Sequence, residues 1–110
     1  MANLYEMTLR RDPFDRILRG EKTIEYRLHD KKRSLLKVGD QIRFTNGERS
    51  LLVEILQIVA APSFVDLKEE LLREGLLGEE PFSPESMLEY YPHGAERKYG
   101  VVGIKMKLLG

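Results

Sequence analysis

The chain has 110 residues, of which 42% are hydrophobic, with 18 basic and 18 acidic side chains and no cysteine. This size fits one compact domain over residues 1–110 and is too small for two. Without cysteine, a disulfide framework and a thiol nucleophile are excluded, and with only two histidines we expect neither a metal nor a cofactor. No run of about 18 apolar residues and no secretory signal pattern is visible, so the sequence predicts a cytoplasmic protein without membrane contact.

The zero net charge hides an uneven distribution along the chain. Residues 1–43 hold 11 basic and 7 acidic side chains, residues 44–96 hold 3 and 11, and residues 97–110 hold 4 and none. If the two basic ends meet in the fold, one face becomes positive and could receive phosphates. A mixed charged surface that keeps a small domain in solution explains the same numbers.

The first predicted elements are a strand, a short helix and a second strand. Residues 4–9 alternate loosely and predict a strand. Asp12 is then a suitable helix N-cap, and Gly20 ends the apolar stripe of that helix. Residues 23–28 alternate cleanly, which is typical of a half-buried strand.

A hairpin is predicted in the middle of the chain. Residues 29–37 are basic and indicate a loop or a short helical turn, followed by a strand at 41–45. Asn46 and Gly47 both tolerate the positive φ of a type I′ turn, so we expect the strand at 51–59 to return antiparallel.

Two helices and a last strand complete the pattern. Ser63 is expected to cap the first of these helices, which ends at Gly75, and Ser83 the second, which Pro92 stops. A polar turn at 93–98 and a strand at 99–109 follow. Since the order lacks a long βαβ alternation, it predicts the α+β class, a small mixed, mainly antiparallel barrel with helical insertions.

Polar chemistry concentrates at the second predicted strand. Lys22 stands where the helix meets the strand, and the strand period places Thr23, Glu25 and Arg27 on one face, away from Ile24 and Tyr26. Such groups can bind a phosphate, bind a base edge or shift one another's pKa values for proton transfer. A solvated strand face with a Glu25–Arg27 ion pair is the alternative interpretation.

This segment resembles a known family. Gly20, Lys22, Glu25 and Arg27 match the G-x-K-x-x-E-x-R signature of ASCH domains. The likeness to small stand-alone prokaryotic ASCH proteins extends over nearly the whole chain through Val38-Gly39-Asp40, Tyr91-Pro92 and Tyr99-Gly100-Val101-Val102. The resemblance implies a PUA-like β-barrel.

The resemblance also implies a ligand, namely RNA or a modified nucleotide held in a cleft beside the barrel. Lys22 and Arg27 would meet a phosphate or a base edge, with Thr23 beside them, and Glu25 would accept from a base amino group or orient Arg27. We expect a monomer.

Tyrosines and a basic run could enlarge this binding surface. Tyr91 and Tyr99, together with Tyr90, could stack on an unpaired base, although packing in the core is the simpler interpretation for each of them. The run Lys31-Lys32-Arg33 could extend the positive field, or be a solvated loop.

An enzymatic alternative follows from the same resemblance. Some short ASCH proteins hydrolyse N4-acetylcytidine with a lysine, a threonine and a glutamate. Lys22 matches that lysine, but Glu25 occupies the position of the threonine, which Thr23 does not match, and either Glu79 or Glu80 would be the glutamate. Hydrolysis would then use Glu25 as general base, with Lys22 polarising the carbonyl.

A third alternative is a protein-interaction module in RNA metabolism or transcription, since ASCH domains also occur in transcription coactivators.

The two histidines do not indicate a ribonuclease. His29 and His93 lack a spacing diagnostic of ribonuclease chemistry.

Overall fold

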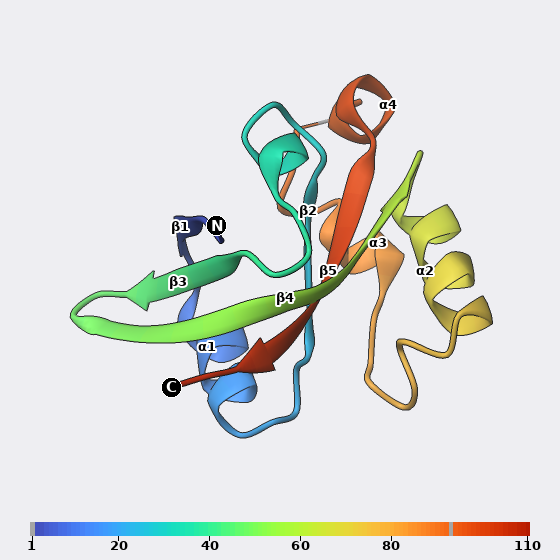
Figure 1. Cartoon of the computed structure of the whole chain (residues 1–110). Helices are drawn as coiled ribbons and strands as arrows, with labels where there is room; N and C mark the ends of the chain where they lie inside the picture. The colour runs from blue at the N-terminus through green and yellow to red at the C-terminus, as the bar shows by residue number, and fades with distance from the viewer. Residues whose placement is uncertain (1, 93) are drawn as a thin grey trace.

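The computed structural model describes residues 2–92 and 94–110 and contains one five-stranded sheet (Figure 1). Its strands are β1 (Leu4–Thr8), β2 (Ile24–Leu28), β3 (Gln41–Asn46), β4 (Arg49–Ala61) and β5 (Val101–Leu108). They lie in the order β1-β3-β4-β5-β2, in which β1 and β3 are parallel and all other pairs antiparallel. The sheet curves into a half-barrel, which confirms the predicted α+β class and its mixed, mainly antiparallel sheet.

The helices flank the curved sheet. They are α1 (Arg11–Leu18), the 3₁₀ turn η1 (Arg33–Leu35), α2 (Phe64–Arg73), α3 (Pro84–Met87) and α4 (Ala95–Tyr99). In Figure 1, α1 lies near β3, whereas α2 and α3 lie beside β5 and the end of β4. Among the described residues, no helix is both long enough and apolar enough to cross a membrane.

The helix caps agree with the sequence at two of three positions. The side chains of Ser63 and Ser83 accept the backbone N–H groups of Asp66 and Ser86, as predicted for the starts of α2 and α3. The first helix differs, because α1 begins at Arg11 and Asp12 lies within its first turn. In this turn the negative charge of Asp12 interacts favourably with the positive end of the helix dipole, but its side chain does not cap the helix.

Two other local predictions need correction. The hairpin forms, but Asn46 pairs with Arg49, so the turn consists of residues 47 and 48, and only Gly47 has a positive φ. This excludes the type I′ turn, which needs two such residues. Where a polar turn was predicted, Ala95–Tyr99 form the helix α4, so β5 starts at Val101 rather than at 99. His93 lies outside the described residues.

Two hydrophobic clusters hold the helices to the sheet. The first joins α1 to β1, β3, β4 and β5 and contains Phe14, Ile17, Ile42, Phe44 and Ile104. The second joins α2 and the segment before α3 to β2 and β5, through Ile24, Phe64, Leu67, Phe82 and Val101. Three polar residues of the sequence signature, Lys22, Glu25 and Arg27, lie together at β2, and two of them are buried.

Candidate functional site

A cavity of about 540 Å³ lies between α1 and the segment of residues 80–91, with β2 as its floor. The α1 side contributes Thr8, Leu9, Arg10, Asp12, Pro13 and Arg16. The floor contributes Lys22, Glu25, Tyr26 and Arg27. The opposite wall, called the 80–91 wall below, contributes Glu80, Pro81, Phe82, Ser83, Ser86, Met87, Tyr90 and Tyr91.

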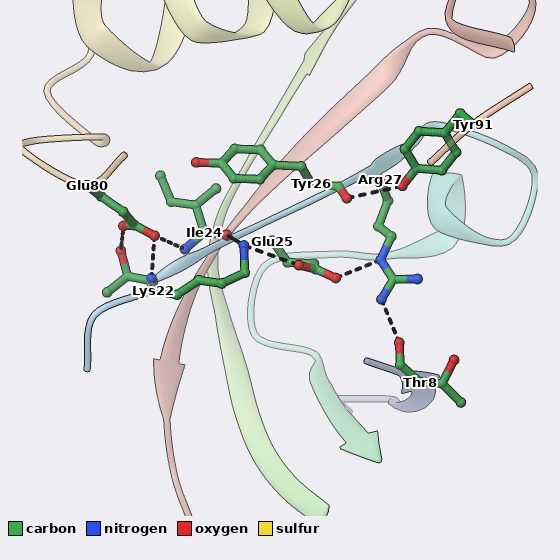
Figure 2. Close-up of polar contacts among 9 residues, drawn as sticks. Thr8, Lys22, Ile24, Glu25, Tyr26, Arg27, Glu80 and Tyr91 are labelled. Atoms are coloured by element: carbon green, nitrogen blue, oxygen red, sulfur yellow. Dashed lines mark hydrogen bonds and ion pairs between the residues drawn. The ribbon is translucent and has the colours of Figure 1, made fainter. Parts of the chain in front are cut away.

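The floor is organised by one buried carboxylate between two cations (Figure 2). Glu25 is only 5% exposed, and its Oε2 accepts the Nε–H of Arg27 at 2.7 Å. Its Oε1 lies 3.4 Å from the Nζ of Lys22, which is 8% exposed and donates to the carbonyl of Ile24 at 2.5 Å. Burial removes water from this trio, so the Glu25 carboxylate is compensated by the two cations, and each cation depends on Glu25.

Arg27 also joins the two open edges of the half-barrel. Its Nη2 donates to the carbonyl of Thr8 in β1 at 2.8 Å, although β1 and β2 are at opposite ends of the sheet order. Lys32, from the segment after β2, similarly donates to the carbonyl of Glu6 at 3.2 Å. Side chains rather than backbone pairs therefore bridge these two edges, and Arg27 has both a structural contact and a place in the cavity.

The 80–91 wall is attached to the floor by Glu80. Its Oε1 accepts the backbone N–H of Thr23 at 2.8 Å and that of Ile24 at 3.4 Å, and its Oε2 accepts the Thr23 hydroxyl at 2.6 Å. Lys105 donates to the same hydroxyl at 2.8 Å. Thr23 therefore turns away from the cavity floor and serves as an anchor for the wall.

Tyr26 lies between the floor and the wall. Its ring stacks on Phe82 at 3.9 Å between centroids, and the Nζ of Lys22 lies 4.7 Å from its centroid. The buried hydroxyl has no hydrogen-bond partner among the described residues. Burial, with the nearby Glu80 and Glu25 charges, raises the pKa of Tyr26, so the phenol stays neutral.

Tyr91 borders the cavity, as does Tyr90, the other predicted aromatic ligand on this wall. The ring of Tyr91 stacks on Phe64 at 5.8 Å, and its hydroxyl donates to the carbonyl of Tyr26 at 3.4 Å. Burial raises the pKa of Tyr91. Much of the ring is thus used for packing, and the part that borders the cavity is held in a fixed orientation.

The structure brings together four of the six residues predicted for the site. Lys22, Glu25, Arg27 and Tyr91 line the cavity, whereas Thr23 and Tyr99 do not. Tyr99 lies on α4 with the Nζ of Lys98 over its ring. The basic run at 31–33 does not line the cavity either.

Of the two candidate glutamates, only Glu80 lines this cavity, and both glutamates border a neighbouring surface depression. Arg10 and Arg16, which the sequence analysis did not single out, also line the cavity. Neither makes an ion pair or a side-chain hydrogen bond within the described residues. No group of three His, Cys, Asp or Glu side chains in the described part of the chain is placed to hold a metal ion.

Comparison with known proteins identifies the class to which this fold and cavity belong. The family model of the ASCH domain matches residues 7–110, so the chain belongs to the ASCH domain family. The predicted family membership is therefore confirmed. A search of curated proteins found no match.

Solved structures agree with this assignment. The crystal structure of hypothetical protein PH0355 is 35% identical, with a TM-score of 0.75, and the match covers 96% of this chain and 99% of that one. The solution structure of protein PF0455 from Pyrococcus furiosus is 36% identical, with a TM-score of 0.66 and coverage of 96% and 97%. ASCH from Zymomonas mobilis shares the fold at 17% identity, with a TM-score of 0.63 over 93% of this chain and 65% of that one.

Proposed function

We propose that this chain binds RNA or a modified nucleotide by taking one base into the cavity above β2. The observation that carries the proposal is the buried Glu25 carboxylate, fixed between Lys22 and Arg27 on the floor of a cavity with aromatic residues in its wall. The volume of about 540 Å³ lies in the range of about 300–1,000 Å³ typical of small-molecule sites. Membership of the ASCH family supports a nucleic-acid ligand.

Each floor residue has a distinct role in this proposal. Glu25 keeps free lone pairs on both carboxylate oxygens, which can accept hydrogen bonds from a base amino group. Lys22 and Arg27 hold that carboxylate in place and present their remaining N–H groups to a base carbonyl or a phosphate. The Tyr91 ring limits one side of the space that the base would occupy.

Titration with the four ribonucleoside 5′-monophosphates and with short single-stranded RNA tests the proposal. Arg27→Ala should weaken binding more than Lys31→Ala, because Arg27 faces the cavity whereas Lys31 adds only to the field around it. Circular dichroism must show that both variants fold. Equal losses in the two variants count against a defined cavity, and binding of none of these ligands overturns the proposal.

A hydrolytic function is the second candidate, because Lys22 and Glu25 lie 3.4 Å apart in the same cavity. In this reaction Glu25 would take a proton from water as the water oxygen attacks the acyl carbon of an N4-acylated cytidine. Lys22 would stabilise the oxyanion. The C–N bond would then break, the proton would pass to the leaving amine, and cytidine and the free acid would form. The Thr23 hydroxyl, which donates to Glu80, takes no part in this scheme.

Chromatography of N4-acetylcytidine incubated with the wild type and with Glu25→Gln decides between the two candidates. Turnover that is lost in Glu25→Gln supports the hydrolase. Absence of turnover, together with saturable binding of nucleotide or RNA, supports the recognition function alone. Binding that weakens steeply with salt would further distinguish a nucleic-acid ligand from a protein partner.

A further inference from the structure

The two walls of the cavity touch each other through the side chains of Arg10 and Tyr90. The guanidinium carbon of Arg10, just before α1, lies 4.2 Å from the ring centroid of Tyr90, which follows α3. Both residues line the cavity, and Tyr90 is 50% exposed. A flat cation thus covers one face of an aromatic ring that faces both the cavity and solvent.

Tyr90 differs from the other aromatic residues that line the cavity. The rings of Tyr26 and Phe82 stack on each other, and Tyr91 stacks on Phe64. Those faces are buried in packing that a ligand cannot replace without disturbing the second hydrophobic cluster. For Tyr90, the recorded ring contact is the one with Arg10, an exposed side chain without a carboxylate partner in the described residues.

This contact can be exchanged at little cost. An exposed cation–π contact is weak, and stacking of a nucleic-acid base on an aromatic side chain is stronger because more apolar area leaves water. A guanidinium that leaves the ring stays at the mouth of the cavity, where its paired N–H groups match the oxygens of a phosphate. A base carrying a phosphate would therefore gain both contacts, and an unphosphorylated nucleoside only the first.

We propose that Tyr90 is the stacking platform for the bound base, that Arg10 covers it in the empty cavity, and that Arg10 then moves to the ligand's phosphate. The inference rests on the proposed nucleotide or RNA binding and names two ligand-contacting residues outside the sequence signature. The phosphate can belong to a mononucleotide or to an RNA strand, since both present the same anionic oxygens.

Substitution of Tyr90 is the direct test, and the chain offers a matched control. Tyr99 is also an exposed tyrosine, 43% accessible, with a cation over its ring, but it does not line the cavity. Tyr90→Leu should weaken binding of 5′-CMP by roughly tenfold, Tyr90→Phe should bind within about twofold of wild type, and Tyr99→Leu should also stay within about twofold. Because the chain has no tryptophan, tyrosine fluorescence can follow the titration.

Arg10→Gln separates the two roles of Arg10. This variant should bind cytidine at least as tightly as wild type, because the platform is no longer covered, and should bind 5′-CMP several-fold more weakly, because the phosphate contact is lost. A parallel titration with 5′-CMP and a short oligocytidine tells which source of phosphate is preferred. Equal effects of Arg10→Gln on cytidine and 5′-CMP overturn the phosphate role.

The outcomes keep the inference separate from the function on which it rests. If wild type binds and Glu25→Gln weakens binding, but Tyr90→Leu binds like wild type, the stacking platform is refuted while the proposed function stands. If wild type binds neither nucleotides nor RNA, both are refuted. Loss of binding in Tyr99→Leu but not in Tyr90→Leu would return the stacking role to the tyrosine on α4.

Discussion

The floor and the 80–91 wall of the cavity border the same space but are held in place by different means. The floor strand β2 pairs with β5 from Ile24 to Leu28, so the sheet fixes its position. The wall contains only the four-residue helix α3 and depends on the hydrogen bonds of Glu80 and on the contact of Phe82 with Tyr26. The comparison indicates that changes in the floor act first on the stability of the fold, whereas changes in the wall act on the shape of the cavity.

The largest effect is expected for Glu25→Ala. It leaves Lys22 and Arg27, whose side chains are 8% and 16% exposed, without their shared counter-charge. Breaking a buried ion pair on one side costs about 3–5 kcal/mol of unfolding free energy, measurable by urea denaturation. The control Glu21→Gln breaks the exposed pair with Arg19 and should leave the free energy of unfolding close to that of wild type, because water screens this pair. Equal losses of unfolding free energy in Glu25→Ala and Glu21→Gln would show that burial of Lys22, Glu25 and Arg27 does not affect stability.

Glu80→Ala is expected to have the next largest effect. It removes the acceptor of three hydrogen bonds from Thr23 and Ile24, at about 2 kcal/mol of stability. Hydrogen exchange should accelerate at the amide of Thr23 before it does so in the centre of β5. Glu79→Gln is the matched control, because the neighbouring side chain is exposed and makes none of these bonds, and its exchange should stay unchanged. If hydrogen exchange at the amide of Thr23 is unchanged in Glu80→Ala, the position of the wall does not depend on Glu80.

Alkaline pH should loosen the contact between wall and floor. The raised pKa values of Tyr26 and Tyr91 mean that both phenols hold their protons more tightly in the folded chain than in the unfolded chain. The contribution of the two protonated phenols to the free energy of unfolding is therefore complete below about pH 10 and is lost as the pH rises above that value. The free energy of unfolding should fall by up to about 1.4 kcal/mol per pH unit for each tyrosine. The slope should decrease in Tyr26→Phe, and an unchanged slope would exclude Tyr26 as its source.

The smallest effect is a gain. Tyr26→Phe removes a buried hydroxyl that has no partner among the described residues and keeps the ring that stacks on Phe82. The variant should be more stable by about 1 kcal/mol at pH 7, because an unsatisfied buried donor costs about that much. A rise in Tm on calorimetry checks this. A lower Tm would show that the hydroxyl finds a partner in solution, such as a water molecule.

The floor was largely predictable from the sequence, and the wall was not. The period of two along residues 23–28 and the spacing of the family signature place Glu25 and Arg27 together, with Lys22 at the start of the strand. That period fails at Thr23, which precedes the first residue of β2 and is turned by Glu80, 57 positions away. No local pattern encodes such a distant partner.

The same reasoning explains why the helix α4 and the contact of Arg10 with Tyr90 were not predicted. Residues 93–98 have the composition of a turn, but Glu96 accepts the N–H of Phe64 at 2.6 Å, a long-range bond that helps to hold α4 against the start of α2. Arg10 lies next to Arg11, and the sequence gives no reason to expect one rather than the other at the cavity. Only the fold shows that one of them faces Tyr90 across the cavity and the other pairs with Asp15.

The bridging of β1 by side chains has a consequence for aggregation. An edge strand offers its free carbonyls to strands of other molecules, and natural proteins protect such edges with lysine and with covering groups. Here Lys32 and Arg27 occupy the carbonyls of Glu6 and Thr8. A cavity variant at Arg27 therefore also uncovers part of this edge, and its preparations should form intermolecular β-structure at lower protein concentration than those of wild type.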